Sequence, residues 1–329
     1  MMKEVLKMKI IELLSELWKR RCVEMSDNIE VIGIDHGWMM MKTASQVFKA
    51  SAEEISTEPA FFDNILEYNG KYYEIGCKRV VVKENKTEND NYYLLTLAAI
   101  AKELKKRDKH QAKVFIAAGL PLSRFGDEKE SFTQYLKANR NVRFKYNTEL
   151  FDVEIVNVAV FPQCYAAVVD QIGTFRQKVI VVDVGSWTID IMPIENKKPI
   201  NEKCISKPIG LITCMRDVNS ECYRKLGEEV DECIIQSVMR GENPSISDEY
   251  VEVIRNQIHN YVESVYHSLR EYGVNLKTTR IVFVGGGSSV MKNFGAIDNK
   301  NISYILDIKS NAKGFEHMGI MAIKKKNGR

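Results

Sequence analysis

The stretch V-I-V-V-D-V-G-S-W-T-I-D-I at residues 179–191 decides the expected fold of this chain. Its first four residues are β-branched and apolar, which is typical of a strand buried on both faces. The strand reaches Asp183, turns at Gly185, and is expected to return as a second strand through Asp190. A glycine at such a tip lets backbone N–H groups approach an anion, and the two flanking carboxylates would hold a hydrated cation. Taken alone, the stretch is equally compatible with an ordinary turn between core strands.

A second hairpin with the same pattern of strand, acidic residue and glycine turn is expected near the start of the chain. Residues 30–42 read E-V-I-G-I-D-H-G-W-M-M-M-K, with Asp35 closing an apolar strand, Gly37 in the turn and Lys42 in the return. If the two hairpins face each other, Asp35 and Asp183 lie across one cleft, where Lys42 would neutralise a terminal phosphate. The pair therefore predicts a phosphate site between two halves of the protein.

A third unit follows at residues 280–292, which read R-I-V-F-V-G-G-G-S-S-V-M-K. The pattern predicts a buried strand, a turn of three glycines and a helix with Ser288 or Ser289 as its N-cap. A lone glycine-rich turn is weak evidence for a nucleotide site. Three strand–turn units, two of which carry an acid, are considerably stronger evidence.

These units resemble the nucleotide loops of the actin-like ATPases, within the actin, chaperone and sugar-kinase superfamily, and look most similar to plasmid-segregation actins of the ParM/StbA type. The segment at 32–42 resembles the first phosphate loop, 181–190 the second, and 282–289 the adenosine loop. Four shorter segments resemble the family more weakly and occur in the family's order: A-A-G-L-P at 117–121, V-F-P-Q at 160–163, P-I-G-L-I-T at 208–213 and S-N-A-K-G-F at 310–315. The resemblance covers the chain from about Ile29 to its end.

The resemblance implies an α/β, actin-like (ribonuclease H-like) fold with two duplicated α/β domains around a nucleotide cleft. Domain I is expected over residues 29–172 and domain II over 173–305. Residues 306–329 are expected to return to domain I, so that both domain connections lie at one hinge. The halves share no sequence identity beyond the hairpins, and the duplication is inferred from the resemblance.

The resemblance also implies the chemistry, which is ATP hydrolysis with Mg²⁺, with GTP left open as the nucleotide. Asp35 and Asp183 are the expected catalytic carboxylates and would position Mg²⁺ through its water shell, joined by Asp190. Gln163 corresponds to the residue that orients the attacking water, although a polar residue in a loop is its alternative interpretation. The expected nucleotide contacts are Gly37, Lys42, Gly185, Ser186, Thr188, Gly285, Gly286, Gly287 and Ser288.

Two tryptophans depart from the family pattern. Trp38 and Trp187 stand in the two hairpins where relatives usually carry a small residue. The indoles would either shield the triphosphate from water or pack into the sheets as ordinary strand side chains. Nucleotide binding is therefore better supported than fast turnover, and a slow ATPase is expected.

Composition limits the possible functions. A chain of 329 residues suggests two domains, and 45% hydrophobic with 28% charged residues is typical of a soluble globular protein. A net charge of +3 is too slight to predict direct nucleic-acid binding. Seven cysteines without a C-x-x-C pair indicate reduced thiols in a cytoplasmic protein. No apolar run is long enough to predict a membrane span.

Residues 1–28 form a separate amphipathic segment. Apolar residues recur at helical spacing, namely Leu6, Ile10, Leu13, Leu14, Leu17 and Trp18. The helix would pack on the body of the protein or on a neighbouring subunit. An equally ranked alternative is that translation begins at Met25, directly before the first strand. Membrane contact is the third interpretation and is disfavoured by the mixed charge.

Hydrophobic periodicity predicts the remaining elements. We expect a hairpin over Ile65–Ile75 that turns at Asn69-Gly70, and a loop over Lys83–Asn91. Helices are expected over Tyr92–Arg107, Asp127–Asn139 and near 208–226, 228–240 and 247–272, with a closing helix from Ser310. Strands are expected over Gln46–Ala50, Val114–Ala118, Val142–Tyr146, Glu149–Val160 and Ile302–Ile308.

Two classes of function are compatible with these features. The first is a filament-forming ATPase that assembles with ATP and moves plasmid or mobile-element DNA through a DNA-binding adaptor of the ParR type. The second is a non-polymerising ATPase or kinase of the same superfamily, or a scaffold that uses nucleotide as a switch. A sugar kinase needs inserted substrate loops, for which the chain has little spare length.

Overall fold

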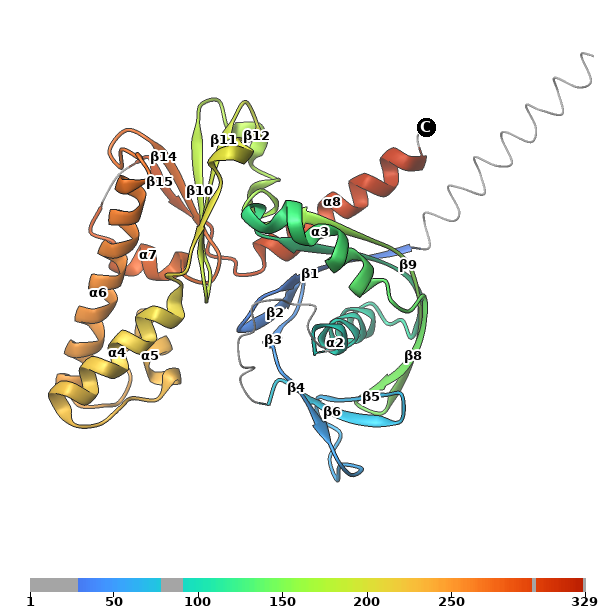
Figure 1. Ribbon diagram of the computed structural model, residues 1–329. Coiled ribbons are helices and arrows are strands. Elements are labelled where there is room, and N and C mark those ends of the chain that lie inside the picture. The colour runs from blue at the N-terminus through green and yellow to red at the C-terminus, as the bar shows by residue number, and fades with distance from the viewer. Residues whose placement is uncertain (1–28, 78–90, 298–299, 328–329) are drawn as a thin grey trace, which may run out of the picture.

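The computed structural model describes residues 29–77, 91–297 and 300–327 (Figure 1). These residues form two β-sheets flanked by helices, which confirms the predicted α/β class. The segment 1–28 and the predicted loop at 83–91, apart from Asn91, lie outside the described residues. Within the described part of the chain, no helix is long and apolar enough to cross a membrane.

The first sheet has nine strands in the order β3-β2-β1-β7-β9-β8-β5-β6-β4. Its strands are β1 (Ile29–His36), β2 (Met40–Thr43), β3 (Val47–Lys49), β4 (Ala52–Ile55), β5 (Ile65–Tyr68), β6 (Lys71–Ile75), β7 (Gln111–Leu120), β8 (Asn141–Tyr146) and β9 (Glu149–Pro162). The sheet curves around helix α2 (Asn91–Lys106), whose residues 92–101 are all buried or nearly so (Figure 1). Because the sheet wraps around α2, this helix is buried on more than the single face that a surface helix buries.

Most of the elements predicted for the first sheet are confirmed. The hairpin β5–β6 turns at Asn69 and Gly70, which have φ angles of 52° and 75°, as a tight two-residue turn requires. Helix α3 (Leu122–Leu136) begins five residues earlier than predicted, directly after Pro121, because it packs against β7 and β9.

The second sheet has the order β12-β11-β10-β14-β15, and β13 pairs with β11. Its strands are β10 (Val179–Val184), β11 (Ile189–Glu195), β12 (Lys198–Pro199), β13 (Ile205–Lys207), β14 (Arg280–Val284) and β15 (Ile302–Tyr304). Its helices are α4 (Leu211–Leu226), α5 (Glu232–Met239), α6 (Asp248–Glu271) and α7 (Ser288–Phe294). Short 3-10 turns are η1 (Ala166–Val168), η2 (Ile172–Thr174) and η3 (Asn201–Lys203).

Two predictions for the second half are wrong in detail. The strand expected to reach Ile308 ends at Tyr304, and the chain then turns towards α8. Neither Ser288 nor Ser289 is the N-cap of α7, because the cap position belongs to Gly287 and the helix already includes both serines. The Ser288 hydroxyl instead donates to the carbonyls of Gly285 and Ile305, at 2.9 and 2.8 Å.

The closing helix α8 (Ser310–Asn327) packs against β1, β7 and η1 of the first half. Gly33 allows this approach, since a Cβ atom there would lie 2.0 Å from the carbonyl oxygen of Ala312. The chain therefore returns to the first sheet after building the second. The domain boundaries at residues 172/173 and 305/306 stay predictions.

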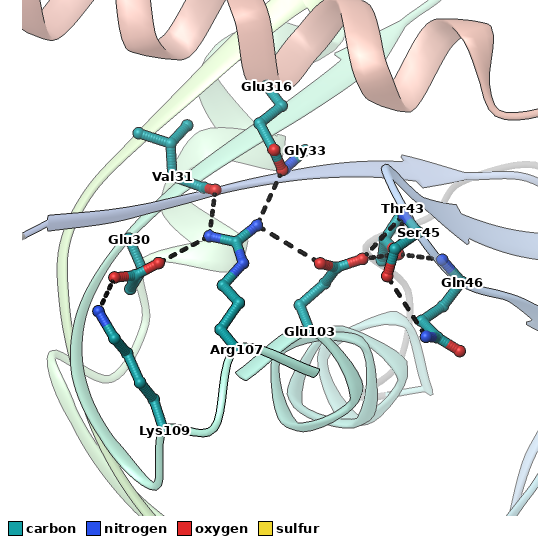
Figure 2. Close-up of polar contacts among 10 residues, drawn as sticks. All are labelled: Glu30, Val31, Gly33, Thr43, Ser45, Gln46, Glu103, Arg107, Lys109 and Glu316. Atoms are coloured by element: carbon teal, nitrogen blue, oxygen red, sulfur yellow. Dashed lines mark hydrogen bonds and ion pairs between the residues drawn. The ribbon is translucent and has the colours of Figure 1, made fainter. Parts of the chain in front are cut away.

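A polar network anchors α8 to the first sheet (Figure 2). Arg107, at the end of α2, donates to Glu30 at 2.8 Å and to the carbonyl of Val31 at 3.0 Å. Its other terminal nitrogen donates to Glu316 of α8 at 3.2 Å and to Glu103 at 3.4 Å. Because one guanidinium serves three carboxylates and a backbone carbonyl, α8, α2 and β1 are held in one fixed arrangement.

Candidate functional site

A cavity of about 130 Å³ that opens to solvent lies where the tips of the two hairpins meet. The structure brings ten of the predicted site residues to its walls: Asp35, Gly37, Lys42, Gln163, Asp183, Gly185, Ser186, Thr188, Asp190 and Gly286. Gly285, Gly287 and Ser288 are not among the lining residues. The chemical roles assigned to all these residues stay predictions.

Strand pairing explains why the charged residues converge. In the β1–β2 ladder Asp35 stands directly opposite Lys42, and in the β10–β11 ladder Asp183 stands opposite Asp190. Each pair lies beside the hairpin tip, so each sheet presents its ionisable groups at the end that faces the other sheet. The two short ladders thus place three carboxylates and one ammonium group around the same cavity.

Asp35 is held from two sides and is almost fully buried. Lys42 Nζ lies 3.1 Å from one carboxylate oxygen, and Gln163 Nε2 donates to the other at 3.0 Å. Gln163 follows the end of β9, and its own N–H is bonded to the carbonyl of Leu120. Its side chain is therefore placed in the site by a tight connection to β7 and does not lie in an unconstrained loop.

The electrostatics of the cavity favour a bound cation. Burial, together with the neighbouring carboxylates of Asp190 and Asp35, raises the pKa of Asp183 to about 7, although Lys42 and Asn311 oppose the shift. Burial acts to lower the pKa of Lys42, but the charges of Asp35 and Asp183 outweigh it and raise that pKa. The lysine therefore stays protonated, and the carboxylates share a single buried ammonium group.

Asp190 accepts hydrogen bonds at both of its oxygens. Thr188 donates to Oδ2 at 3.1 Å, and the hydroxyl of Ser206 on β13 bonds Oδ1. Ser206 is in turn 2.5 Å from the hydroxyl of Ser123 in α3, which belongs to the first half of the chain. Asp190 is thus connected through two hydroxyl groups to helix α3 of the first half of the chain.

The three-glycine turn mainly supports Asp183. Gly285 has a φ angle of 81°, and a Cβ atom there would lie 2.1 Å from Asp183 Oδ1. A Cβ atom at Gly287 would lie 2.3 Å from Cγ1 of Val184, whereas only Gly286 lines the cavity. Two of the three glycines therefore make room for β10, and one faces the cavity.

Both tryptophans line the cavity and also pack against a core, so the two interpretations drawn from sequence are not exclusive. Trp38 packs on the first core, edge-on to Tyr92 with 6.1 Å between ring centroids. Trp187 packs on the second core, with the guanidinium of Arg216 5.7 Å from its ring centroid. The hairpin tips consequently give the mouth of a charged cavity an apolar rim.

Sequence reasoning missed three polar residues in the cavity wall, namely His36, Arg124 and Asn311. Arg124 follows the A-A-G-L-P segment on α3 and pairs with Glu128. Asn311, the second residue of α8, donates from Nδ2 to Asp183 Oδ2 at 2.6 Å. The S-N-A-K-G-F segment, which resembles the family, contains Asn311, but no local pattern distinguishes this asparagine from any other in the chain.

The donor set suits a hydrated metal ion. No group of three or more His, Cys, Asp or Glu side chains that could hold a metal ion directly occurs among residues 29–77, 91–297 and 300–327. Mg²⁺ dehydrates reluctantly and is commonly held by one or two carboxylates, with water and phosphate completing its octahedron. Asp35 and Asp183 on opposite walls meet that requirement.

Two family models match the chain in the order of its two sheets. Residues 32–165 match the N-terminal domain of actin like proteins. Residues 181–294 match the C-terminal domain of the archaeal, MreB-like actin homologues. This chain belongs to the actin-like proteins. Together the two ranges cover most of its length.

Solved structures have the same fold as this actin-like protein. Bacillus thuringiensis ParM with ATP gives a TM-score of 0.68 at 12% identity, covering 92% of this chain and 100% of that chain. The archaeal actin homologue Ta0583 with ADP gives 0.68 at 20%, covering 87% and 98%. A 15-stranded ParM filament from Clostridium botulinum gives 0.67 at 18%, covering 89% and 99%. No curated protein sequence gives a significant match.

Proposed function

We propose that this actin-like protein binds ATP and Mg²⁺ in the cavity, hydrolyses the terminal phosphate slowly and assembles into filaments. The observation that carries the proposal is the convergence of Asp35, Lys42 and Asp183 from two separate sheets on one cavity. Nucleotide in structures of two relatives supports ATP as the ligand, and filament formation by ParM of Clostridium botulinum supports self-association.

The proposed chemistry needs positioning and charge stabilisation more than covalent catalysis. Asp35 and Asp183 would hold the hydrated metal ion, and Lys42 would contact a terminal phosphate oxygen. The N–H groups of Gly37 and Gly185 are bonded within the turns to the carbonyls of Asp35 and Thr188, so the two glycines would let the phosphates approach the backbone while the Ser186 hydroxyl donates to them. When bound, Mg²⁺ neutralises charge on the phosphate oxygens. Gln163, already fixed against Asp35 at 3.0 Å, would orient the attacking water.

The proposal is tested by sedimentation and phosphate release. At tens of micromolar protein, we expect pelleting at high speed with ATP and Mg²⁺, and none with ADP or with EDTA added. Parallel samples with GTP establish the nucleotide preference, and negative-stain images identify filaments in the pellet. Protein that stays in the supernatant with every nucleotide, while still binding ATP, would remove the filament part of the proposal and leave the nucleotide site.

An exposed aromatic residue provides a candidate filament contact. Phe61 lies in the loop that joins β4 to β5, and its side chain is 84% exposed. Burying a phenylalanine side chain stabilises an interface by about 1.5–3 kcal/mol. We propose that a second copy of this chain covers Phe61 in the filament.

Phe61→Ser is therefore expected to raise the critical concentration for pelleting about tenfold or more. The affinity for ATP, followed through tryptophan fluorescence, should not change, because the loop does not line the cavity. Glu58→Ser, an exposed change in the same loop, serves as the control and should leave the critical concentration close to the wild-type value. Equal critical concentrations for Phe61→Ser and Glu58→Ser would remove Phe61 from the interface.

The likeness to ParM proteins supports a proposal for the cellular role. We propose a cytoplasmic protein that segregates plasmid or mobile-element DNA through a DNA-binding adaptor of the ParR type. A net charge of only +3 supports an adaptor as the component that contacts DNA. Pull-down of purified protein with and without ATP, from cells that carry the parent DNA element, would identify such a partner.

The apolar rim favours a second candidate function, a nucleotide-switched scaffold. Trp38 and Trp187 line the cavity from opposite hairpins and would restrict the access of bulk water to a bound triphosphate. Tight ATP binding with negligible phosphate release and no pelleting would favour this candidate over the filament.

A further inference from the structure

Helix α8 bridges the two halves of the molecule. Its body is anchored to the first sheet through Glu316 and Arg107 (Figure 2). Its first turn carries Asn311, which reaches Asp183 at the end of β10 in the second sheet. One rigid helix thus connects the first half of the molecule to a carboxylate that the second half presents to the cavity.

Asn311 contacts one oxygen of the Asp183 carboxylate, and the backbone at Gly285 lies beside the other oxygen. The side-chain amide of Asn311 donates to Asp183 Oδ2 at 2.6 Å, and Gly285 leaves just enough room for Oδ1. Only the NH₂ end of an asparagine donates, so this contact determines which end of the amide faces the carboxylate. The orientation of the Asp183 carboxylate is therefore determined by groups on both sides.

The other end of the same amide is unused. Asn311 is only 4% exposed, and within the described part of the chain its Oδ1 atom has no hydrogen-bond partner. A buried amide oxygen without a partner costs about 1–3 kcal/mol, so such atoms are usually satisfied by water or a ligand. Since Asn311 lines the cavity, a bound, hydrated ion would bring water molecules to this wall.

We propose that Asn311 is a positioning residue for the metal site: Nδ2 orients Asp183, and Oδ1 accepts a hydrogen bond from a water molecule in the Mg²⁺ shell. The proposal rests on the proposed ATPase function and deepens it. Partners that orient metal-binding carboxylates typically contribute a factor of about 10–100 in metal affinity or activity. A residue with only a structural role would affect stability without affecting the metal dependence.

The test compares metal binding in wild-type protein, Asn311→Ala and Lys313→Ala. Lys313 lies on the same helix turn but forms an exposed ion pair with Asp307 outside the cavity, so its variant controls for changes to α8 itself. Mn²⁺ binding to the ADP-loaded protein is measured by electron paramagnetic resonance, and ADP affinity is measured in EDTA. The Mg²⁺ concentration for half-maximal phosphate release is the third measurement.

For Asn311→Ala we expect Mn²⁺ affinity to fall about tenfold or more and the half-maximal Mg²⁺ concentration to rise by a similar factor. ADP affinity in EDTA should stay within about twofold of wild type, as should all three values for Lys313→Ala. If the alanine variant does not fold, Asn311→Leu is used, which keeps the volume of the side chain. It should lose metal affinity as well, because leucine has neither a donor for Asp183 nor an acceptor for water.

Wild-type Mn²⁺ affinity and Mg²⁺ dependence in a folded Asn311 variant would overturn the positioning role and leave the ATPase proposal intact. Wild-type protein that binds neither ADP nor Mn²⁺ would overturn the proposed function and this inference with it. The two failures are therefore distinguishable.

Discussion

Asp183→Ala is expected to reduce Mg²⁺-dependent phosphate release by at least about 100-fold and to abolish ATP-dependent pelleting. The reason is geometric, because Asp183 is the carboxylate that the second sheet contributes opposite Asp35. Without it, the remaining carboxylate on that wall is Asp190, whose two oxygens already accept hydrogen bonds from Thr188 and Ser206. Phosphate release is measured at saturating ATP and Mg²⁺, and pelleting on the same samples.

The stability of the nucleotide-free protein provides the control for this prediction. The folded-state pKa of Asp183, about 7, lies above the ordinary 3.8, so this group makes the folded state less stable as pH rises from about 4 to about 7. Asp183→Asn removes the buried charge while keeping the shape. At pH 8 we expect it to be more stable than wild type by an amount on the order of 1–3 kcal/mol, measured by urea unfolding, yet inactive.

An inactive and destabilised Asp183→Asn variant would mean that Asp183 mainly supports the fold. An active variant would exclude the proposed metal role altogether. Only lost activity combined with unchanged or increased stability would support the proposed role of Asp183. In that role the carboxylate is required for activity, although its burial makes the folded state less stable.

Gly285→Ala is expected to be as damaging to activity as removal of a cavity residue, although Gly285 does not line the cavity. Its added methyl group would lie 2.1 Å from Asp183 Oδ1 and would force the carboxylate out of position. A displacement of about 1 Å at a reacting centre can cost about 100-fold in rate. We therefore expect about a 100-fold loss of phosphate release, with weaker Mn²⁺ binding.

Gly273→Ala separates this clash from simple backbone strain. Gly273 has a φ angle of 86°, close to the 81° of Gly285, but an added Cβ there meets no described atom within 4 Å. Both variants should lose roughly 1–2 kcal/mol of stability from the left-handed backbone. Only Gly285→Ala should lose activity, and equal activity in the two variants would exclude the proposed support of Asp183.

Local patterns in the sequence were sufficient to predict most of the helices and strands and the main residues of the cavity. Apolar β-branched runs that end in an acid and a glycine predict the hairpins at 30–42 and 179–191, because strand burial and turn chemistry act over a few neighbouring residues. The same local rules predict the tight turn at Asn69-Gly70 and the long helix α6. That Asp35 and Asp183 meet across one cavity was predicted from the paired hairpins and the family resemblance together.

Other features were decided only by the tertiary structure. Asn311 holds Asp183 across 128 residues of chain, and Arg107 holds Glu316 across 209, distances over which no local periodicity carries information. The early start of α3 and the end of β15 likewise depend on how each segment packs. The sequence by itself thus determined which residues form the two acid-bearing hairpins, since that requires only near neighbours. Which distant side chains orient those acids was decided by the return of α8 to the first sheet.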